Sequence, residues 1–146
     1  MYLIDTNVIS AGAPSRLAPP ALIAWMDGHS ASLFVSAVTV AEIEDGIAKL
    51  RRESVTRKGE DLAAWLEALL HLYGDRILPF DTATARLAGT LSDRARGQGQ
   101  APGFADIVIA ATALHHGLTI LSRNLKHFEP LGVRVLDPFA TLPTTP

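Results

Sequence analysis

The sequence of 146 residues contains no cysteine, which excludes disulfide bonds and thiolate metal sites. It also has no apolar run near the ~20 residues that a helix needs to span a bilayer. No basic segment precedes an apolar one at the N-terminus, and the acidic Asp5 comes early, so we expect no signal peptide. These absences predict a soluble, cytoplasmic protein that makes no membrane contact.

The chain also lacks a strong charge imbalance, with 13 Lys and Arg residues against 15 Asp and Glu residues. This balance argues against a broad basic surface for duplex DNA. It remains compatible with nucleic acid held through a metal ion and a few local cations. With 48% hydrophobic residues and no internal repeat or linker, the chain is expected to form one domain with a substantial core.

Short apolar runs alternate with amphipathic helical stretches along the chain. This alternation predicts an α/β fold with a mainly parallel central sheet flanked by helices. We assign the domain to residues 1–137 and expect the Pro/Thr-rich residues 138–146 to form a poorly ordered C-terminal tail. The strands are expected at residues 2–4, 33–35, 77–80, 118–121 and 133–136, and the main helices at 39–52, 62–73, 82–96 and 105–116.

Three carboxylates are unusual because each lies in an otherwise apolar, Ala-rich stretch. Asp5 ends the first strand, Glu42 is expected in the first turn of the helix after the second strand, and Asp106 opens the helix before the fourth. Ligands of such sheets bind beyond the carboxyl ends of the strands, so we expect the three side chains at one edge. Mg²⁺ and Mn²⁺ prefer carboxylate and water ligands, and a bound ion can activate water against a phosphodiester. The sequence therefore predicts a divalent-metal site.

Each carboxylate also has a purely structural interpretation. Asp5 would cap the helix that begins near Asn7, and Glu42 would close a capping box with Thr39. Asp106 would interact favourably with the dipole of its own helix. We favour the functional interpretation for Asp5, whereas for Glu42 and Asp106 taken singly the two interpretations are about equal. Their joint arrangement favours the metal site.

Four segments resemble the motifs of PIN-domain ribonucleases, in particular the VapC/FitB-like toxins of type II toxin–antitoxin systems. Any one motif alone is weak, but four in the family's order and at these spacings are specific. Together they cover the chain from residue 1 to about residue 137. They read LIDTNVIS at residues 3–10, VSAVTVAEI at 35–43 with Gly46, ADIVIAATA at 105–113, and LSRN at 121–124 with Phe128.

The resemblance implies a PIN-like three-layer α/β/α fold and a metal-dependent ribonuclease. It implies that Asp5, Glu42 and Asp106 are the catalytic residues and hold Mg²⁺ or Mn²⁺. Thr6 or Asn7 would contact Asp5 and hold its carboxylate in position without binding the metal ion.

The same resemblance indicates one departure from the family pattern. The group typically carries a fourth acid in or just after the segment that contains Arg123, where this chain has Asn124 and His127. We therefore expect a one-metal site, with the Asn124 amide near a metal-bound water or a ligand. Arg123 would either contact RNA phosphate or pair with a nearby acid. Lys126 is a further candidate for RNA contact, although solvated surface is the favoured interpretation.

Partners follow from the resemblance as well. It implies an RNA substrate, a homodimer and a small cognate antitoxin, whose helix would fit an apolar groove between the helices of Trp25 and Trp65. The first alternative is a haloacid-dehalogenase-like phosphatase, which needs an acid two residues after Asp5, where Asn7 stands. The second is a PIN-fold RNA- or protein-binding module with a weakened or inactive metal site. The missing fourth acid supports this module, and the three retained acids oppose it.

Overall fold

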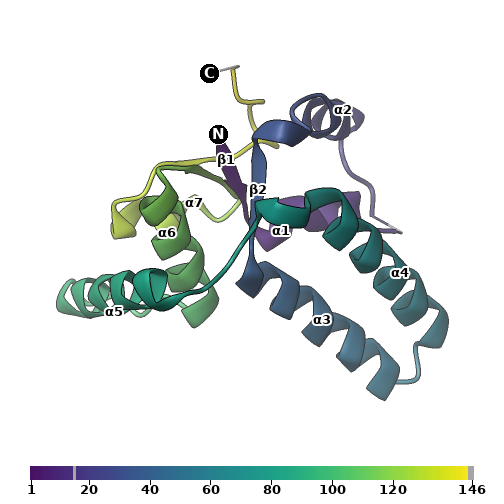
Figure 1. Ribbon diagram of the computed structural model, residues 1–146, viewed down its shortest axis with the longest axis horizontal. Coiled ribbons are helices and arrows are strands. Elements are labelled where there is room, and N and C mark those ends of the chain that lie inside the picture. The colour runs from purple at the N-terminus through teal and green to yellow at the C-terminus, as the bar shows by residue number, and fades with distance from the viewer. Residues whose placement is uncertain (15, 145–146) are drawn as a thin grey trace.

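The computed structural model describes residues 1–14 and 16–144. Its centre is a five-stranded sheet in which all paired strands run parallel, in the order β3-β2-β1-β4-β5 (Figure 1). Because parallel strands end at the same edge, the segments that follow β1, β2 and β4 leave the sheet side by side. The strands are β1 (Tyr2–Ile4), β2 (Leu33–Ser36), β3 (Ile77–Leu78), β4 (Thr119–Leu121) and β5 (Val135–Leu136).

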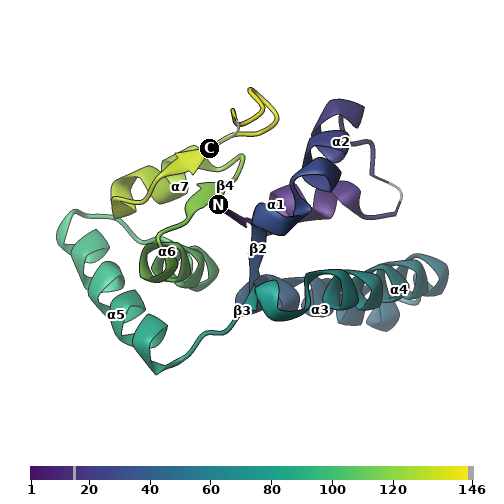
Figure 2. The same cartoon turned by 45° about the horizontal axis from the view of Figure 1, so that its top comes forward.

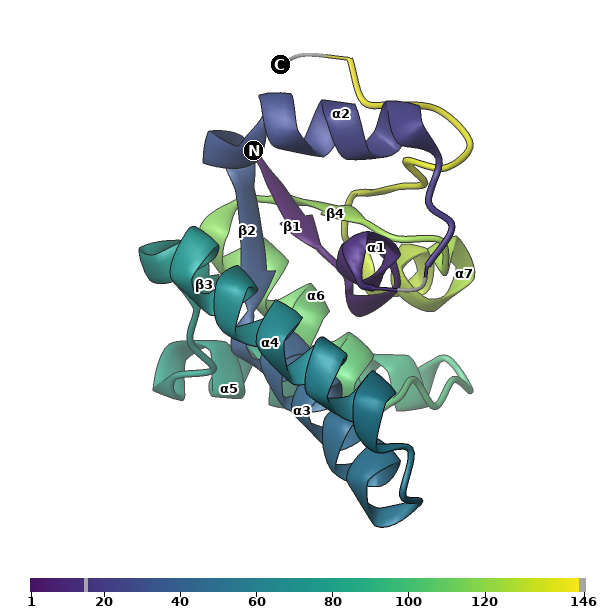
Figure 3. The same cartoon turned by 90° about the vertical axis from the view of Figure 1, so that its right-hand side faces the viewer.

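Helices cover both faces of this sheet, so the three-layer α/β/α expectation is confirmed. Figures 1 and 2 show α3 and α4 on one side of the strands and α5 and α6 on the other. In Figure 3, α3 and α4 pack side by side as a helical hairpin. The helices of the described residues are α1 (Thr6–Ile9), α2 (Pro20–Gly28), α3 (Ala37–Arg52), α4 (Thr56–Tyr73), α5 (Thr82–Gly97), α6 (Phe104–His116) and α7 (Leu125–Phe128).

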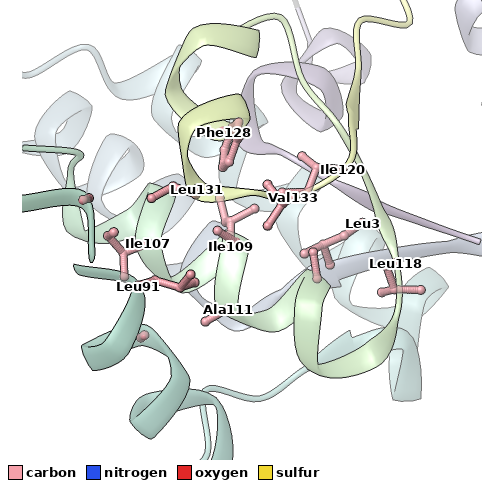
Figure 4. Packing of buried hydrophobic residues seen from close by; sticks show 14 of the residues in the cluster. Leu3, Leu91, Ile107, Ile109, Ala111, Leu118, Ile120, Phe128, Leu131 and Val133 are labelled. Atoms are coloured by element: carbon pink, nitrogen blue, oxygen red, sulfur yellow. The ribbon is translucent and has the colours of Figure 1, made fainter. Parts of the chain in front are cut away.

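Each face of the sheet has its own apolar core, because successive side chains of a strand point to opposite faces. Leu3 and Ile120 lie in the cluster formed with α5, α6 and the fully buried Phe128 (Figure 4). Ile4 and Leu121, one residue further along the same strands, lie in the second cluster with α1, α3 and α4. The two cores hold β1 and β4 rigidly between them and so fix the position of the residues that follow.

Two boundaries differ from the sequence expectation. β3 ends at Leu78, before Pro79, which has no N–H to continue a ladder. The helix expected from Thr39 begins at Ala37, because the Ser36 hydroxyl accepts a hydrogen bond from the Val38 N–H at 3.3 Å and caps it.

The described part of the C-terminal segment contacts the domain, and the expected poor order of residues 138–146 stays a prediction. Phe139 packs against the second core, and the Tyr2 hydroxyl donates to the carbonyl of Thr144 at 3.3 Å. Residues 145–146 lie outside the described residues, and the domain boundary at residue 137 stays a prediction. None of the described helices combines the length and the apolar character needed to cross a membrane.

Candidate functional site

A cavity of about 520 Å³ opens at the carboxyl edge of the sheet. Three elements supply its acids: the end of β1 supplies Asp5, α3 supplies Glu42 and the first turn of α6 supplies Asp106. The expectation that these three side chains meet at one edge is therefore fulfilled. The cavity is lined by all seven residues expected at the site, namely Asp5, Thr6, Asn7, Glu42, Asp106, Arg123 and Asn124.

The Asp5 carboxylate is almost fully buried and receives three hydrogen bonds. The Thr6 N–H donates to Oδ1 at 2.7 Å, and Oδ2 accepts from Asn7 Nδ2 at 2.9 Å and from Ser122 Oγ at 2.6 Å. The first of these contacts caps α1, so Asp5 has the structural role that the sequence also allowed. The Asp5 side chain therefore both caps α1 and lines the cavity.

The surroundings of the Asp5 carboxyl group make its ionised form costly. Burial raises its pKa above the ordinary value of an aspartate, and the charges of Asp106 and Glu42 raise this pKa further. The hydrogen bonds from Ser122 and Thr6 act in the opposite direction. A buried carboxylate with two acidic neighbours gains stability from a bound cation, so the donor set fits a metal ion.

Ser122 connects the two halves of the site, a role that the sequence did not reveal. Its fully buried hydroxyl donates to Asp5 and accepts from Asn7 Nδ2 at 3.1 Å and from the Asn124 N–H at 2.9 Å. Asn7 Oδ1 in turn accepts from the Arg123 N–H at 3.2 Å. The segment after β4 is thereby fixed to α1. The motif at residues 121–124 contained the signal, but sequence spacing does not indicate which hydroxyl bonds which carboxylate.

Glu42 is held by Thr6, and the alternative structural role, a capping box with Thr39, is wrong. The Thr6 hydroxyl donates to Glu42 Oε1 at 2.5 Å and lies 3.3 Å from the hydroxyl of the buried Thr39. Because Ser36 caps α3, Glu42 lies in the second turn of the helix rather than the first. Thr6 therefore supports Asp5 through its backbone and Glu42 through its side chain.

Asp106 has a histidine as its partner. His127 Nδ1 lies 3.0 Å from Asp106 Oδ2, and no fourth carboxylate of the described residues lines the cavity. The sequence identified His127 as one of the two residues where the family carries a further acid. Its contact with Asp106 could not be read from the sequence.

Two arginines bring positive charge to this acidic cavity. Arg123 forms no ion pair within residues 1–14 and 16–144, and its guanidinium lies 4.8 Å from the centre of the Phe139 ring. Arg16 also lines the cavity, although the sequence analysis did not single it out. Its signal is weak, because it lies in a Gly/Pro/Ser-rich loop without a motif.

The carboxylates alone do not enclose a cation. No group of three His, Asp or Glu side chains in the described residues is arranged to hold a metal ion by itself. Mg²⁺ usually keeps several water ligands and is bound directly by one or two carboxylates. A cavity of about 520 Å³ lined by Asp5, Glu42 and Asp106 has room for such a hydrated ion.

Comparisons with known proteins agree with this geometry. The family model of the PIN domain matches residues 2–130. The chain is 37% identical over 142 residues to "Toxin FitB" of Neisseria gonorrhoeae, covering 95% of this chain and 99% of the relative. It is 34% identical over 149 residues to "VapC ribonuclease Y4jK" of Sinorhizobium fredii, covering 95% and 98%.

A solved structure is similar over the same length. The crystal structure of FitAcB from Neisseria gonorrhoeae superimposes with a TM-score of 0.81 at 37% identity, covering 94% of this chain and 98% of that chain. The sequence matches over almost the whole length of both relatives, and the fold matches over almost the whole length of the FitAcB chain. With three acids collected at the carboxyl edge of a parallel sheet, this chain belongs to the PIN-domain family.

Proposed function

We propose that this protein is a divalent-metal-dependent endoribonuclease and the toxin of a type II toxin–antitoxin pair. The observation that carries the proposal is that three acids and two arginines line the same cavity: Asp5, Glu42, Asp106, Arg16 and Arg123. Acids suit a cation, and arginines suit the phosphates of a nucleic acid. The names of the relatives, a toxin and a VapC ribonuclease, support the same conclusion. PIN-domain nucleases are generally metal-dependent.

In the proposed site, Asp5, Glu42 and Asp106 would hold Mg²⁺ or Mn²⁺. When bound, such a cation neutralises charge on a phosphodiester and makes water more acidic. The chain's own groups prepare this site: Ser122 and the Thr6 N–H fix the Asp5 carboxylate, and the Thr6 hydroxyl fixes Glu42.

The attacking water and the substrate phosphate need their own contacts. A carboxylate oxygen of the three acids would orient the water and accept its proton as the water attacks phosphorus in line; the P–O bond opposite the water breaks, and the leaving oxygen takes a proton from solvent. Arg16 and Arg123 donate to the phosphate oxygens, and stacking on Phe139 limits the orientations of the Arg123 guanidinium. Asn124 also lines the cavity, and its amide is available to the water or to the substrate. With three acids rather than four, the site binds one metal ion.

The proposed partners are cellular RNA, a second copy of the chain and a small antitoxin, and the protein acts in the cytoplasm. An apolar groove of about 240 Å³ between α2 and α4 suits an antitoxin helix, with Met26, Trp65 and Leu72 in its wall. Trp25 is not in this wall: it packs edge-on to Tyr2 at 5.7 Å in the second core.

The test is cleavage of a mixed cellular RNA pool by the purified, antitoxin-free protein. Cleavage is expected with Mg²⁺ or Mn²⁺ and none with EDTA. Asp5→Asn should abolish it, whereas the matched control Asp93→Asn, an exposed acid on α5, should cleave normally. Failure of the folded wild-type protein to cleave any RNA would contradict the proposal and favour a PIN-fold binding module.

A further inference from the structure

A second cavity of about 350 Å³ adjoins the proposed catalytic site. Asp106 lines both cavities. The other side of the second cavity is formed by residues 100–103, and its polar groups include Gln100, Lys126 and His127. A nucleotide next to a phosphate at the catalytic site would therefore reach these side chains.

One nitrogen of the His127 ring is held by Asp106, and the other is free to bind a ligand. Its Nδ1 is held 3.0 Å from Asp106 Oδ2, and the side chain is 44% exposed. Within the described residues the ring makes no second hydrogen bond, so Nε2 is available to a ligand. Lys126, exposed beside it, forms no ion pair with a described residue. The cavity thus combines one fixed imidazole edge with one ammonium group.

The imidazole of His127 and the ammonium of Lys126 match two groups of a ribonucleotide, the 2′-hydroxyl and the phosphate. A ribose 2′-hydroxyl is both a donor and an acceptor, so it can pair with Nε2 whether or not that nitrogen carries a proton. DNA lacks this hydroxyl. The ammonium of Lys126 suits a backbone phosphate, which RNA and DNA share.

We propose that the second cavity binds the ribonucleotide adjacent to the scissile phosphate, with His127 Nε2 on its 2′-hydroxyl and Lys126 on its phosphate. His127 is then the residue by which the protein distinguishes RNA from DNA. Asp106 then has two roles, because it fixes His127 and would also help to hold the cation. The inference rests on the proposed function, since it requires an RNA strand across the catalytic site.

The experiment measures binding of a single-stranded RNA oligonucleotide that the RNA-pool assay identifies as a substrate. Ca²⁺ replaces Mg²⁺, because Ca²⁺ takes oxygen ligands in a looser geometry, and gels verify that the probe stays intact. A series of probes, each with one 2′-deoxy position, is compared with the all-RNA probe. For wild-type protein, one position should weaken binding about fivefold, the effect of one hydrogen bond.

Variants identify the side chain responsible. His127→Ala should weaken binding of the all-RNA probe by the same factor and should no longer respond to that 2′-deoxy position. Lys126→Ala should weaken RNA and DNA alike and reduce the salt dependence by about one phosphate contact. His116→Ala, an exposed histidine at the opposite end of α6, is the matched control and should behave as wild type.

The probe series with wild-type protein keeps the test independent of how any variant folds. Equal binding of every 2′-deoxy probe would overturn the inference, as would a His127→Ala variant that keeps the position-specific effect. If either result is found and the wild-type protein still cleaves RNA with metal, only the proposed role of the second cavity is refuted. A wild-type protein that neither binds nor cleaves RNA refutes the proposed function as well.

Discussion

Replacing Ser122 by alanine is the sharpest test of how the site is held together. The substitution removes the hydroxyl that donates to Asp5 Oδ2 at 2.6 Å and accepts from Asn7 and Asn124. A hydrogen bond to a charged group contributes about 1.5–3 kcal/mol, and Asn7 Nδ2 remains as a partner for Oδ2. We therefore expect a loss of about 2 kcal/mol in the free energy of unfolding, or about 6 °C in Tm for a chain of this size.

The same substitution should weaken metal binding, because Asp5 loses the contact that orients its carboxylate. Removal of a group that orients a metal ligand typically costs about tenfold to 100-fold in affinity. Mn²⁺ titration of Ser122→Ala and wild type measures this ratio. Thr112→Val is the matched control, since it removes another buried hydroxyl, one that donates to the Val108 carbonyl at 2.7 Å. Unchanged Mn²⁺ affinity in Ser122→Ala, at any stability, would refute the reasoning.

Three further outcomes follow from the structure. In EDTA, the stability of wild type should fall as pH rises from the ordinary aspartate pKa through the raised pKa of Asp5, because the folded state keeps this proton longer than the unfolded state. Asp5→Asn should remove that component, and identical pH profiles of the two proteins by thermal melting would contradict it. Phe128→Ala should cost about 3–5 kcal/mol in urea unfolding, since the ring is fully buried, and a loss under 1 kcal/mol would be inconsistent with that core. Leu72→Asp in the groove between α2 and α4 should abolish antitoxin binding while leaving RNA cleavage intact. The control Leu136→Asp on β5, which also changes an exposed leucine, should preserve both activities. Tight antitoxin binding by Leu72→Asp would show that the antitoxin does not bind in this groove.

The sequence predicted the architecture and the acids because both depend on local patterns. Short apolar runs alternating with amphipathic helices identify a parallel sheet, and parallel strands bring residues at their ends together. Asp5 and Asp106 therefore lie where the pattern placed them. Glu42 also lines the cavity, although it lies one turn deeper in α3 because Ser36 rather than Thr39 is the cap.

The contacts within the site could not be predicted, because they depend on tertiary distances. Ser122 lies 117 positions from Asp5 in the chain, and their hydrogen bond follows from the register of β1 against β4. The pairing of His127 with Asp106 depends on how α7 packs beside α6. Arg16 reaches the cavity from a loop that has no periodic pattern. Residue types alone carry none of this geometry.

The measurement that tests the central claim most directly is the number of Mn²⁺ ions bound per chain, by electron paramagnetic resonance. The account predicts one ion for wild type and loss of that ion in Asp106→Asn, with Asp93→Asn as the control that still binds one. No Mn²⁺ bound by wild type, or full binding by Asp106→Asn, would contradict a site built from Asp5, Glu42 and Asp106.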